Sequence, residues 1–217
     1  MAKKPSSKKP HHQKGTYFDQ PEISRLLAAC PSSTSGIRNR ALLAVLFGAG
    51  LRISEGLAIK KADIDFKKYL VAIHNGKGGR ARTVSIIPAM FPYIEAWIER
   101  REKIGMNRRG PLFCTHTQGE QLKQSGGPIM ANYVRAFLKR LETKLGLEKR
   151  LHSHAFRHSL ANTMMESGRP LNAIQLQLGH ASPATTARYL ASLNPADLVK
   201  HMLAIDTTGV EWLTSKN

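Results

Sequence analysis

The chain has only two cysteines among its 217 residues, Cys30 and Cys114. Two cysteines do not make a disulfide scaffold in a chain of this size, and no Cys-x-x-Cys pair is present to begin a metal site. Both are therefore expected to be small hydrophobic core residues of a protein that works in a reducing compartment.

Long hydrophobic runs are also missing. The longest, residues 41–49, is far shorter than the roughly 20 apolar residues that a transmembrane helix requires. Lysines stand near the N-terminus, but no apolar segment follows them as it would in a secretory signal. We therefore expect no association with a membrane and a cytoplasmic, nucleoid-associated protein.

Acidic residues are scarce, with 15 against 33 lysines and arginines, which gives a formal net charge of +18. Such an excess favours a polyanionic partner, because each neutralised phosphate of a nucleic acid releases condensed counterions. A ribosome-associated or membrane-surface protein would share this charge. With 41% hydrophobic residues, the chain also has enough apolar content to bury a substantial core.

Residues 1–17 carry basic charge and no acidic residue. This segment has too little apolar content to fold alone. We expect a disordered tail that is either a solubilising leader or an arm that contacts DNA. Its five lysines are Lys3, Lys4, Lys8, Lys9 and Lys14.

Beyond the tail, apolar residues recur mostly with helical spacing. Asp19 and Glu22 are a predicted capping pair for the first helix, and Ser35 is expected to cap the second, which ends near Gly48. Further helices are expected over 53–59, from about 94 to 105, over 128–145, 154–167 and 170–179, then after Ser182-Pro183 and from Pro195.

Residues 63–87 have a different character and predict strands. Three apolar clusters, at 64–66, 70–73 and 84–87, suit a three-stranded antiparallel unit whose last two strands are joined by a Gly-rich turn over 75–79. A further short strand is expected over 111–115. The sequence therefore predicts one mainly α-helical domain over 18–217 with a small three-stranded antiparallel sheet.

Arg52 is the first candidate site residue, because it follows a Gly-Ala-Gly break and precedes a short helix. A guanidinium suits phosphate, since its planar fork donates two parallel hydrogen bonds and keeps its charge. Glu55, on the same helical face, could orient Arg52, although the two could also form a surface ion pair. Lys77, in the Gly-rich turn, could bring an ammonium to a leaving oxygen or simply face solvent.

The segment His154-Ala155-Phe156-Arg157-His158 supplies a second pair of candidates. His154 and Arg157 are about one helical turn apart and are expected to project from one face. Arg157 would provide a second phosphate fork, and His154 a hydrogen bond or a proton relay, unless it is a capping or core histidine. A metal site of His152, His154 and His158 is the competing interpretation, but no nearby cysteine or carboxylate completes a ligand set.

His180 and Tyr189 complete the candidate residues. His180 follows Gly179 at an expected helix end, where it could interact with the terminal carbonyls or donate to a phosphate. Tyr189 could be a packed aromatic residue with a satisfied hydroxyl. It could also be a phenolic nucleophile that forms a covalent phosphotyrosyl bond.

Together, the order and spacing of these residues resemble the tyrosine recombinase (phage integrase) family over about residues 18–204. Residues 50–55 resemble its first arginine box and residues 76–84 its lysine hairpin. Residues 154–158 resemble its second box, in which leucine is commoner than the phenylalanine found here. Leu178-Gly179-His180 and Tyr189 match the remaining motifs.

The resemblance implies a DNA breaking-rejoining fold and a phosphotyrosyl mechanism. Tyr189 would attack and leave a 3′-phosphotyrosyl link, and Lys77 would protonate the leaving 5′-hydroxyl. Because the bond energy is kept in that link, neither metal nor ATP is expected to be needed. The scissile phosphate would be bound and activated by Arg52, His154, Arg157 and His180, and the hairpin arginines Arg80 and Arg82 would contact DNA with the tail lysines.

The chain departs from the family in what precedes this domain. Most members carry an N-terminal core-binding domain, where this sequence has only the basic tail, so we expect a natural minimal member. The expected partner is double-stranded DNA, with a tetramer on paired sites; an accessory protein or partner recombinase is a further candidate. The rival functions are a type IB topoisomerase, a DNA-binding regulator derived from a recombinase, and a zinc-dependent nuclease.

Overall fold

The computed structural model describes residues 17–76, 81–106, 110–116 and 126–179. The sheet consists of β1 (Ile64–Asp65), β2 (Leu70–Ile73) and β3 (Arg82–Ser85), antiparallel and in that order. The expected mainly α-helical fold with a small three-stranded antiparallel sheet is confirmed. The helices are α1 (Gln20–Ala28), α2 (Thr34–Gly48), α3 (Ile53–Ala58), α4 (Phe91–Lys103), α5 (Ala131–Leu145), α6 (Ser153–Glu166) and α7 (Leu171–Leu178), with 3-10 turns η1 (Lys61–Asp63) and η3 (Pro88–Met90).

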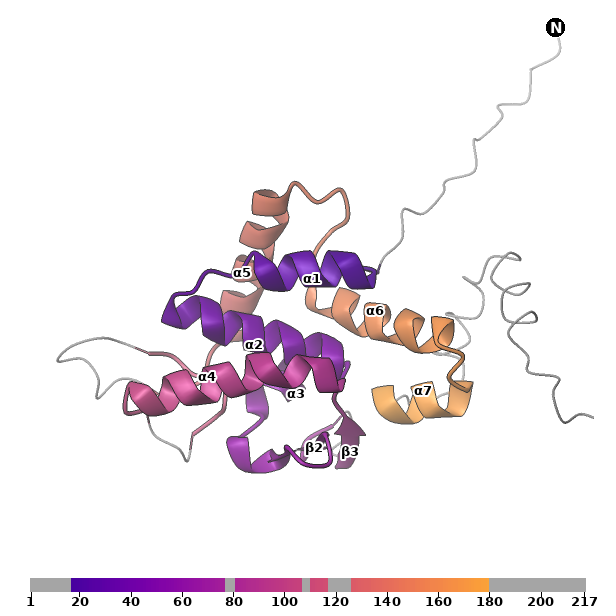
Figure 1. Ribbon diagram of the computed structural model, residues 1–217, viewed down its shortest axis with the longest axis horizontal. Helices are drawn as coiled ribbons and strands as arrows, with labels where there is room; N and C mark the ends of the chain where they lie inside the picture. Colours follow the sequence, from indigo (N-terminus) through magenta and orange to yellow (C-terminus); the bar gives the residue numbers. More distant parts are fainter. Residues whose placement is uncertain (1–16, 77–80, 107–109, 117–125, 180–217) are drawn as a thin grey trace, which may run out of the picture.

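Helix α2 forms the centre of the core. Every residue from Ala41 to Gly48 is buried, and a helix that is apolar on all sides must be covered on all sides. Helices α1, α4 and α6 pack against it (Figure 1). Its last turn is therefore held firmly, and the chain that leaves it at Ala49 begins the candidate site.

The starts of the first two helices follow from capping. Asp19 and Glu22 form the expected capping box: the Asp19 carboxylate accepts from the Glu22 amide at 2.8 Å, and the Glu22 carboxylate accepts from the Asp19 amide at 2.9 Å. The expected cap of α2 is wrong by two residues. Ser33 caps the helix, its hydroxyl accepting from the Gly36 amide at 3.2 Å, because Ser33 has the extended backbone that an N-cap needs. Ser35 bonds instead to His116 at 2.9 Å.

Strand β3 lies two residues earlier than its apolar residues indicated. It pairs with β2 from Arg82 to Ser85, with Val84 opposite Val71 on the buried face. The Ile87 amide then donates to the Gly48 carbonyl at the end of α2, at 3.1 Å. Because the Ile87 amide bonds to α2 and not to β2, Ile87 is not part of the strand.

The strand expected over 111–115 is wrong. Only an isolated bridge joins Cys114 to Pro128 there. The segment is held by α4 and by the end of α3 instead: the Trp97 indole donates to the Leu112 carbonyl at 2.8 Å, and the Leu112 amide donates to the Ile59 carbonyl at 2.6 Å. Because Pro128 is in that bridge, α5 begins at Ala131 rather than at 128.

The remaining helices lie close to their expected places. Helix α6 begins at Ser153, and Pro170 is the N-cap of α7 rather than part of its first turn. Cys30 and Cys114 are both buried and free, as expected. Among the described residues, no helix is long and apolar enough to cross a bilayer. Residues 1–16 of the basic tail and the helices expected after Ser182 lie outside the described residues.

Candidate active site

The candidate site begins where α2 ends. Gly50 has φ +65°, and a Cβ there would lie 2.7 Å from the Cδ2 atoms of both Leu160 and Leu178, so only glycine fits. The last carbonyls of a helix have no partner within it. Here the Ala49 carbonyl accepts from the Gln177 amide at 3.1 Å, and the Gly50 carbonyl accepts from Arg157 Nη1 at 2.7 Å. Side chains of α7 and α6 therefore fix the break that precedes Arg52.

Arg52 is the N-cap residue of α3 and is oriented by Glu55. The Glu55 carboxylate accepts from the Arg52 main-chain amide and from Arg52 Nη1, each at 2.9 Å. The Glu55 side chain is only 2% exposed, whereas that of Arg52 is 24% exposed. The buried Glu55 carboxylate therefore orients the partly exposed Arg52 guanidinium, and the two do not form a surface ion pair.

Arg82 is the second partner of Glu55. Its Nη1 and Nη2 donate to the two Glu55 carboxylate oxygens at 2.8 and 3.0 Å. Arg82 Nε has no hydrogen-bond partner among the described residues, and it lies under Gly179, where a Cβ would approach it to 2.7 Å. The structure thus gives Arg82 a partner inside the protein, and its expected contact with DNA stays a prediction.

The charge of this cluster is set by Glu55. Burial raises its pKa, but the hydrogen bonds and charge of Arg82, together with those of Arg52, more than offset burial and lower the pKa from 4.5 to about 2. Glu55 is therefore ionised at neutral pH. Two guanidinium groups around one carboxylate leave a net positive charge beside the end of α2, which suits an anionic ligand.

Arg157 reaches the same place from α6. It is 4% exposed and donates to the Gly50 and Leu178 carbonyls, so it joins the end of α2 to the end of α7. His154, one turn earlier, is exposed, and its imidazole makes no hydrogen bond to the described residues. Their joint contact with one phosphate stays a prediction. His158 is half-buried; burial first, then the charges of His154, His152 and Arg157, lower its pKa.

Several predicted site residues cannot be placed. Among the described residues, no group of three histidine, cysteine or acidic side chains is arranged to hold a metal ion, the histidines of α6 included. The structure brings together Arg52, Glu55, Arg82 and Arg157. Outside the described residues lie Lys77, Arg80, His180 and Tyr189, with Lys3, Lys4, Lys8, Lys9 and Lys14 of the tail.

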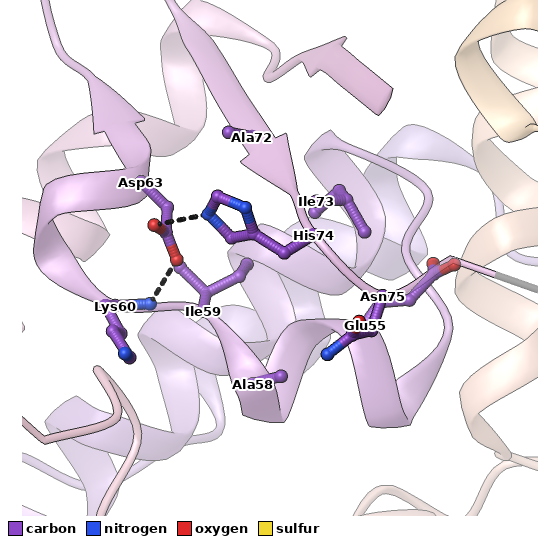
Figure 2. Close-up of a pocket in the computed structure, with 9 residues that line it drawn as sticks. All are labelled: Glu55, Ala58, Ile59, Lys60, Asp63, Ala72, Ile73, His74 and Asn75. Carbon is purple, nitrogen blue, oxygen red and sulfur yellow. Dashed lines mark hydrogen bonds and ion pairs between the residues drawn. The ribbon is translucent and has the colours of Figure 1, made fainter. Parts of the chain in front are cut away.

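A pocket of about 200 Å³ lies beside Glu55 and was not anticipated from the sequence. Glu55 and Asn75 line one end of it, and His74 and Asp63 the other (Figure 2). The His74 Nε2 atom lies 2.9 Å from an Asp63 carboxylate oxygen, and the other oxygen accepts from the Lys60 amide at 2.8 Å. An acidic residue three positions after an N-cap, as Asp63 is to Lys60, is the one sequence signal that could have indicated local structure here.

Gln177 was also missed by sequence reasoning. Its amide oxygen accepts from the Ser85 main-chain amide at 3.1 Å, and its nitrogen donates to the Ser85 carbonyl at 2.7 Å as well as to Ala49. A glutamine between Leu176 and Leu178 is an unremarkable helix residue in the sequence. Only the approach of α7 to the edge of β3 gives it this set of partners.

The sequence pattern of the phage integrase family matches residues 16–195. The chain therefore belongs to the phage integrase family.

Two curated relatives are similar in sequence to most of this chain. The chain is 34% identical over 174 residues to tyrosine recombinase XerC of Salmonella typhi, covering 79% of this chain and 54% of that protein. It is 36% identical over 154 residues to XerC of Rhodospirillum centenum (strain ATCC 51521 / SW), covering 71% and 42%. The chain thus spans about half the length of the curated relatives it matches.

Two solved structures share the fold across most of the chain. The structure of the XerH site-specific recombinase bound to palindromic difH substrate, in a post-cleavage complex, has a TM-score of 0.69 at 25% identity, covering 88% of this chain and 52% of that one. The catalytic domain of bacteriophage HP1 integrase has a TM-score of 0.53 at 22% identity, covering 89% and 97%. The second likeness shows the fold alone.

Proposed function

We propose that this chain is a site-specific DNA recombinase, which cuts and rejoins DNA strands through a covalent 3′-phosphotyrosyl intermediate. The observation that carries the proposal is the convergence of Arg52, Arg82 and Arg157 near the end of α2: Glu55 is the buried acidic partner of Arg52 and Arg82, and Arg157 donates to the Gly50 carbonyl. A fixed, net positive cluster suits a phosphodiester, whose charge grows in the pentacoordinate transition state. The relatives named tyrosine recombinases support the same reaction.

Each candidate residue has its own role in the proposed cleavage reaction. Arg52, Arg157, His154 and His180 hold the non-bridging oxygens of the scissile phosphate. The Tyr189 oxygen attacks phosphorus as the bond to the 5′-oxygen breaks, and Lys77 gives that oxygen a proton. Strand joining runs in reverse, when a 5′-hydroxyl attacks the phosphotyrosine and Tyr189 leaves. The chain needs no cofactor for these steps, because the phosphotyrosyl bond keeps the energy of the bond that was cut.

The wider assembly is proposed on the same basis. Double-stranded DNA is the partner; the XerH neighbour is described as bound to a DNA substrate. The tail over residues 1–17 tracks phosphates, residues 18–217 form the catalytic domain, and four copies assemble on paired sites. The protein acts in the cytoplasm at the nucleoid. Sedimentation of the DNA complex as a monomer at saturating protein would contradict the tetramer.

The reaction is tested by trapping the covalent intermediate. Pooled nicked DNA is incubated with the protein without added metal, and a denaturing gel is examined for a protein–DNA adduct. We expect an adduct in the wild type and none in Tyr189→Phe, which keeps the ring but lacks the nucleophilic oxygen. Sequencing the trapped DNA identifies the target site.

The same experiment separates the rival functions when a supercoil-relaxation assay and a chelator control accompany it. Relaxation of supercoils without strand exchange would favour a type IB topoisomerase. DNA binding with no adduct would favour a regulator derived from a recombinase. Cleavage that is lost on addition of a chelator would favour a zinc-dependent nuclease.

A further inference from the structure

We infer that Gln177 is a positioning residue that holds three segments of the site in register: the end of α2, strand β3 and the end of α7. Its effect on DNA cleavage rests on the function proposed above. The placement itself rests only on the three hydrogen bonds that its carboxamide makes.

The carboxamide makes three hydrogen bonds, all of them to the main chain. An amide side chain offers an oxygen acceptor and two N–H donors. The Gln177 oxygen accepts from the Ser85 amide at 3.1 Å, and its nitrogen donates to the Ser85 carbonyl at 2.7 Å. Because β3 is the last strand of the sheet within the described residues, no strand among them adjoins this side of Ser85. Gln177 therefore pairs with the edge of β3 as the main chain of another strand would.

The third hydrogen bond links this pairing to the segment that carries Arg52. Gln177 donates to the Ala49 carbonyl at 3.1 Å, and Arg157 donates to the next carbonyl, that of Gly50, at 2.7 Å. Two consecutive carbonyls at the end of α2 are therefore bound by side chains from two other helices. The backbone leading to Arg52 is held at two adjacent points, one of which depends on Gln177.

The neighbours of these contacts explain why register matters. On β3, Arg82 lies three residues before Ser85. Gly179, the residue that ends α7, lies two residues after Gln177 and packs against the Arg82 side chain. A shift of α7 along β3 would move Arg82 and the Glu55 carboxylate that it pairs with. Since Glu55 also orients Arg52, one carboxamide fixes the relative places of both guanidinium groups.

A role in positioning is distinguishable from a role in stability. Gln177 is half-buried and Ser85 is exposed, so water can replace most of what the carboxamide provides to the folded chain. Water cannot hold α7 and β3 in one register. Gln177→Met, which fills a similar volume without hydrogen bonds, is therefore expected to keep the fold and lose the alignment. The matched control is Leu176→Gln, on the adjacent residue of the same helix, which is 77% exposed.

The first measurement does not depend on recombination. Hydrogen exchange followed by NMR in the wild type should show a protected Ser85 amide, although this amide faces away from the sheet. In Gln177→Met the exchange of that amide should accelerate roughly fivefold, since one hydrogen bond of ordinary net strength is lost. Leu176→Gln should leave it unchanged. An unprotected Ser85 amide in the wild type would overturn the inference without any variant.

The second measurement tests the consequence for cleavage. Single-turnover adduct formation at saturating protein should be slower in Gln177→Met by roughly 10- to 100-fold, the range expected when a reacting group is misplaced by about 1 Å. The Kd for the same DNA should be unchanged, as should both quantities in Leu176→Gln. An unchanged rate despite faster Ser85 exchange would overturn the positioning role, and so would a parallel loss of rate and affinity. If the wild type forms no adduct, the proposed function fails, and the exchange measurement still decides the placement.

Discussion

Glu55→Gln should destabilise the protein in a way that depends on pH. The substitution keeps the size of the side chain but replaces a buried carboxylate by a neutral amide. Arg52 and Arg82, which both donate to that carboxylate, would then face each other with no negative charge between them. Breaking a buried ion pair from one side is costly because the partner charge stays desolvated.

The magnitude follows from the pKa of Glu55. Folding lowers it from 4.5 to about 2, and one pKa unit corresponds to about 1.4 kcal/mol. A depressed folded-state pKa stabilises the protein above the unfolded value and ceases to do so as pH falls through the folded value. Glu55 ionisation should thus contribute about 3 kcal/mol at pH 7, about 1 kcal/mol at pH 3 and almost nothing near pH 2.

Urea unfolding, followed by the fluorescence of the buried Trp97, would measure this contribution. The free energy of unfolding of Glu55→Gln should be lower than that of the wild type at pH 7, and the gap should shrink at pH 3. The matched control is Glu99→Gln, on an exposed residue of α4 that pairs with Lys103, and it should change little. A gap of the same size at both pH values, or equal effects of the two variants, would refute the reasoning.

Three further predictions concern other parts of the chain. Gly179→Ala should destabilise the fold by about 1–2 kcal/mol in backbone strain, and by more than Gly146→Ala in urea unfolding: both glycines have φ near +60°, but only at Gly179 would the new Cβ meet Arg82. Equal losses would mean that the contact does not matter. The Cys30 thiol, whose pKa burial raises to about 11, should react with iodoacetamide at pH 8 only after unfolding, and rapid labelling of the native protein would contradict its burial. Deleting residues 1–17 should reduce the salt slope of DNA binding by up to about 4 units if all five lysines engage phosphates; an unchanged slope would contradict a DNA-contacting tail.

Much of the fold could be predicted because the local signals were strong. The capping box of α1, the apolar face of α5 and the glycine that ends α7 each depend on residues close in sequence. The errors arose where tertiary contacts decided the outcome. Residues 111–115 are apolar enough for a strand, but side chains of α4 bind the Pro111 and Leu112 carbonyls instead. Ser33 and Ser35 are equally good caps by composition, and backbone geometry selected Ser33.

The sequence by itself indicated the chemistry that we propose for the site. Phosphate chemistry and the family were indicated by the charge of +18 and by the spacing of Arg52, His154, Arg157, His180 and Tyr189. These signals consist of residue types and their order along the chain, which can be read without a structure. The hydrogen-bond partners of the side chains could not be predicted in this way. That Arg82 binds Glu55, and that Gln177 joins Ser85 to Ala49, was decided by tertiary structure alone. Side chains far apart in sequence become partners only when the packing of helices and sheet brings their donors and acceptors within hydrogen-bonding distance.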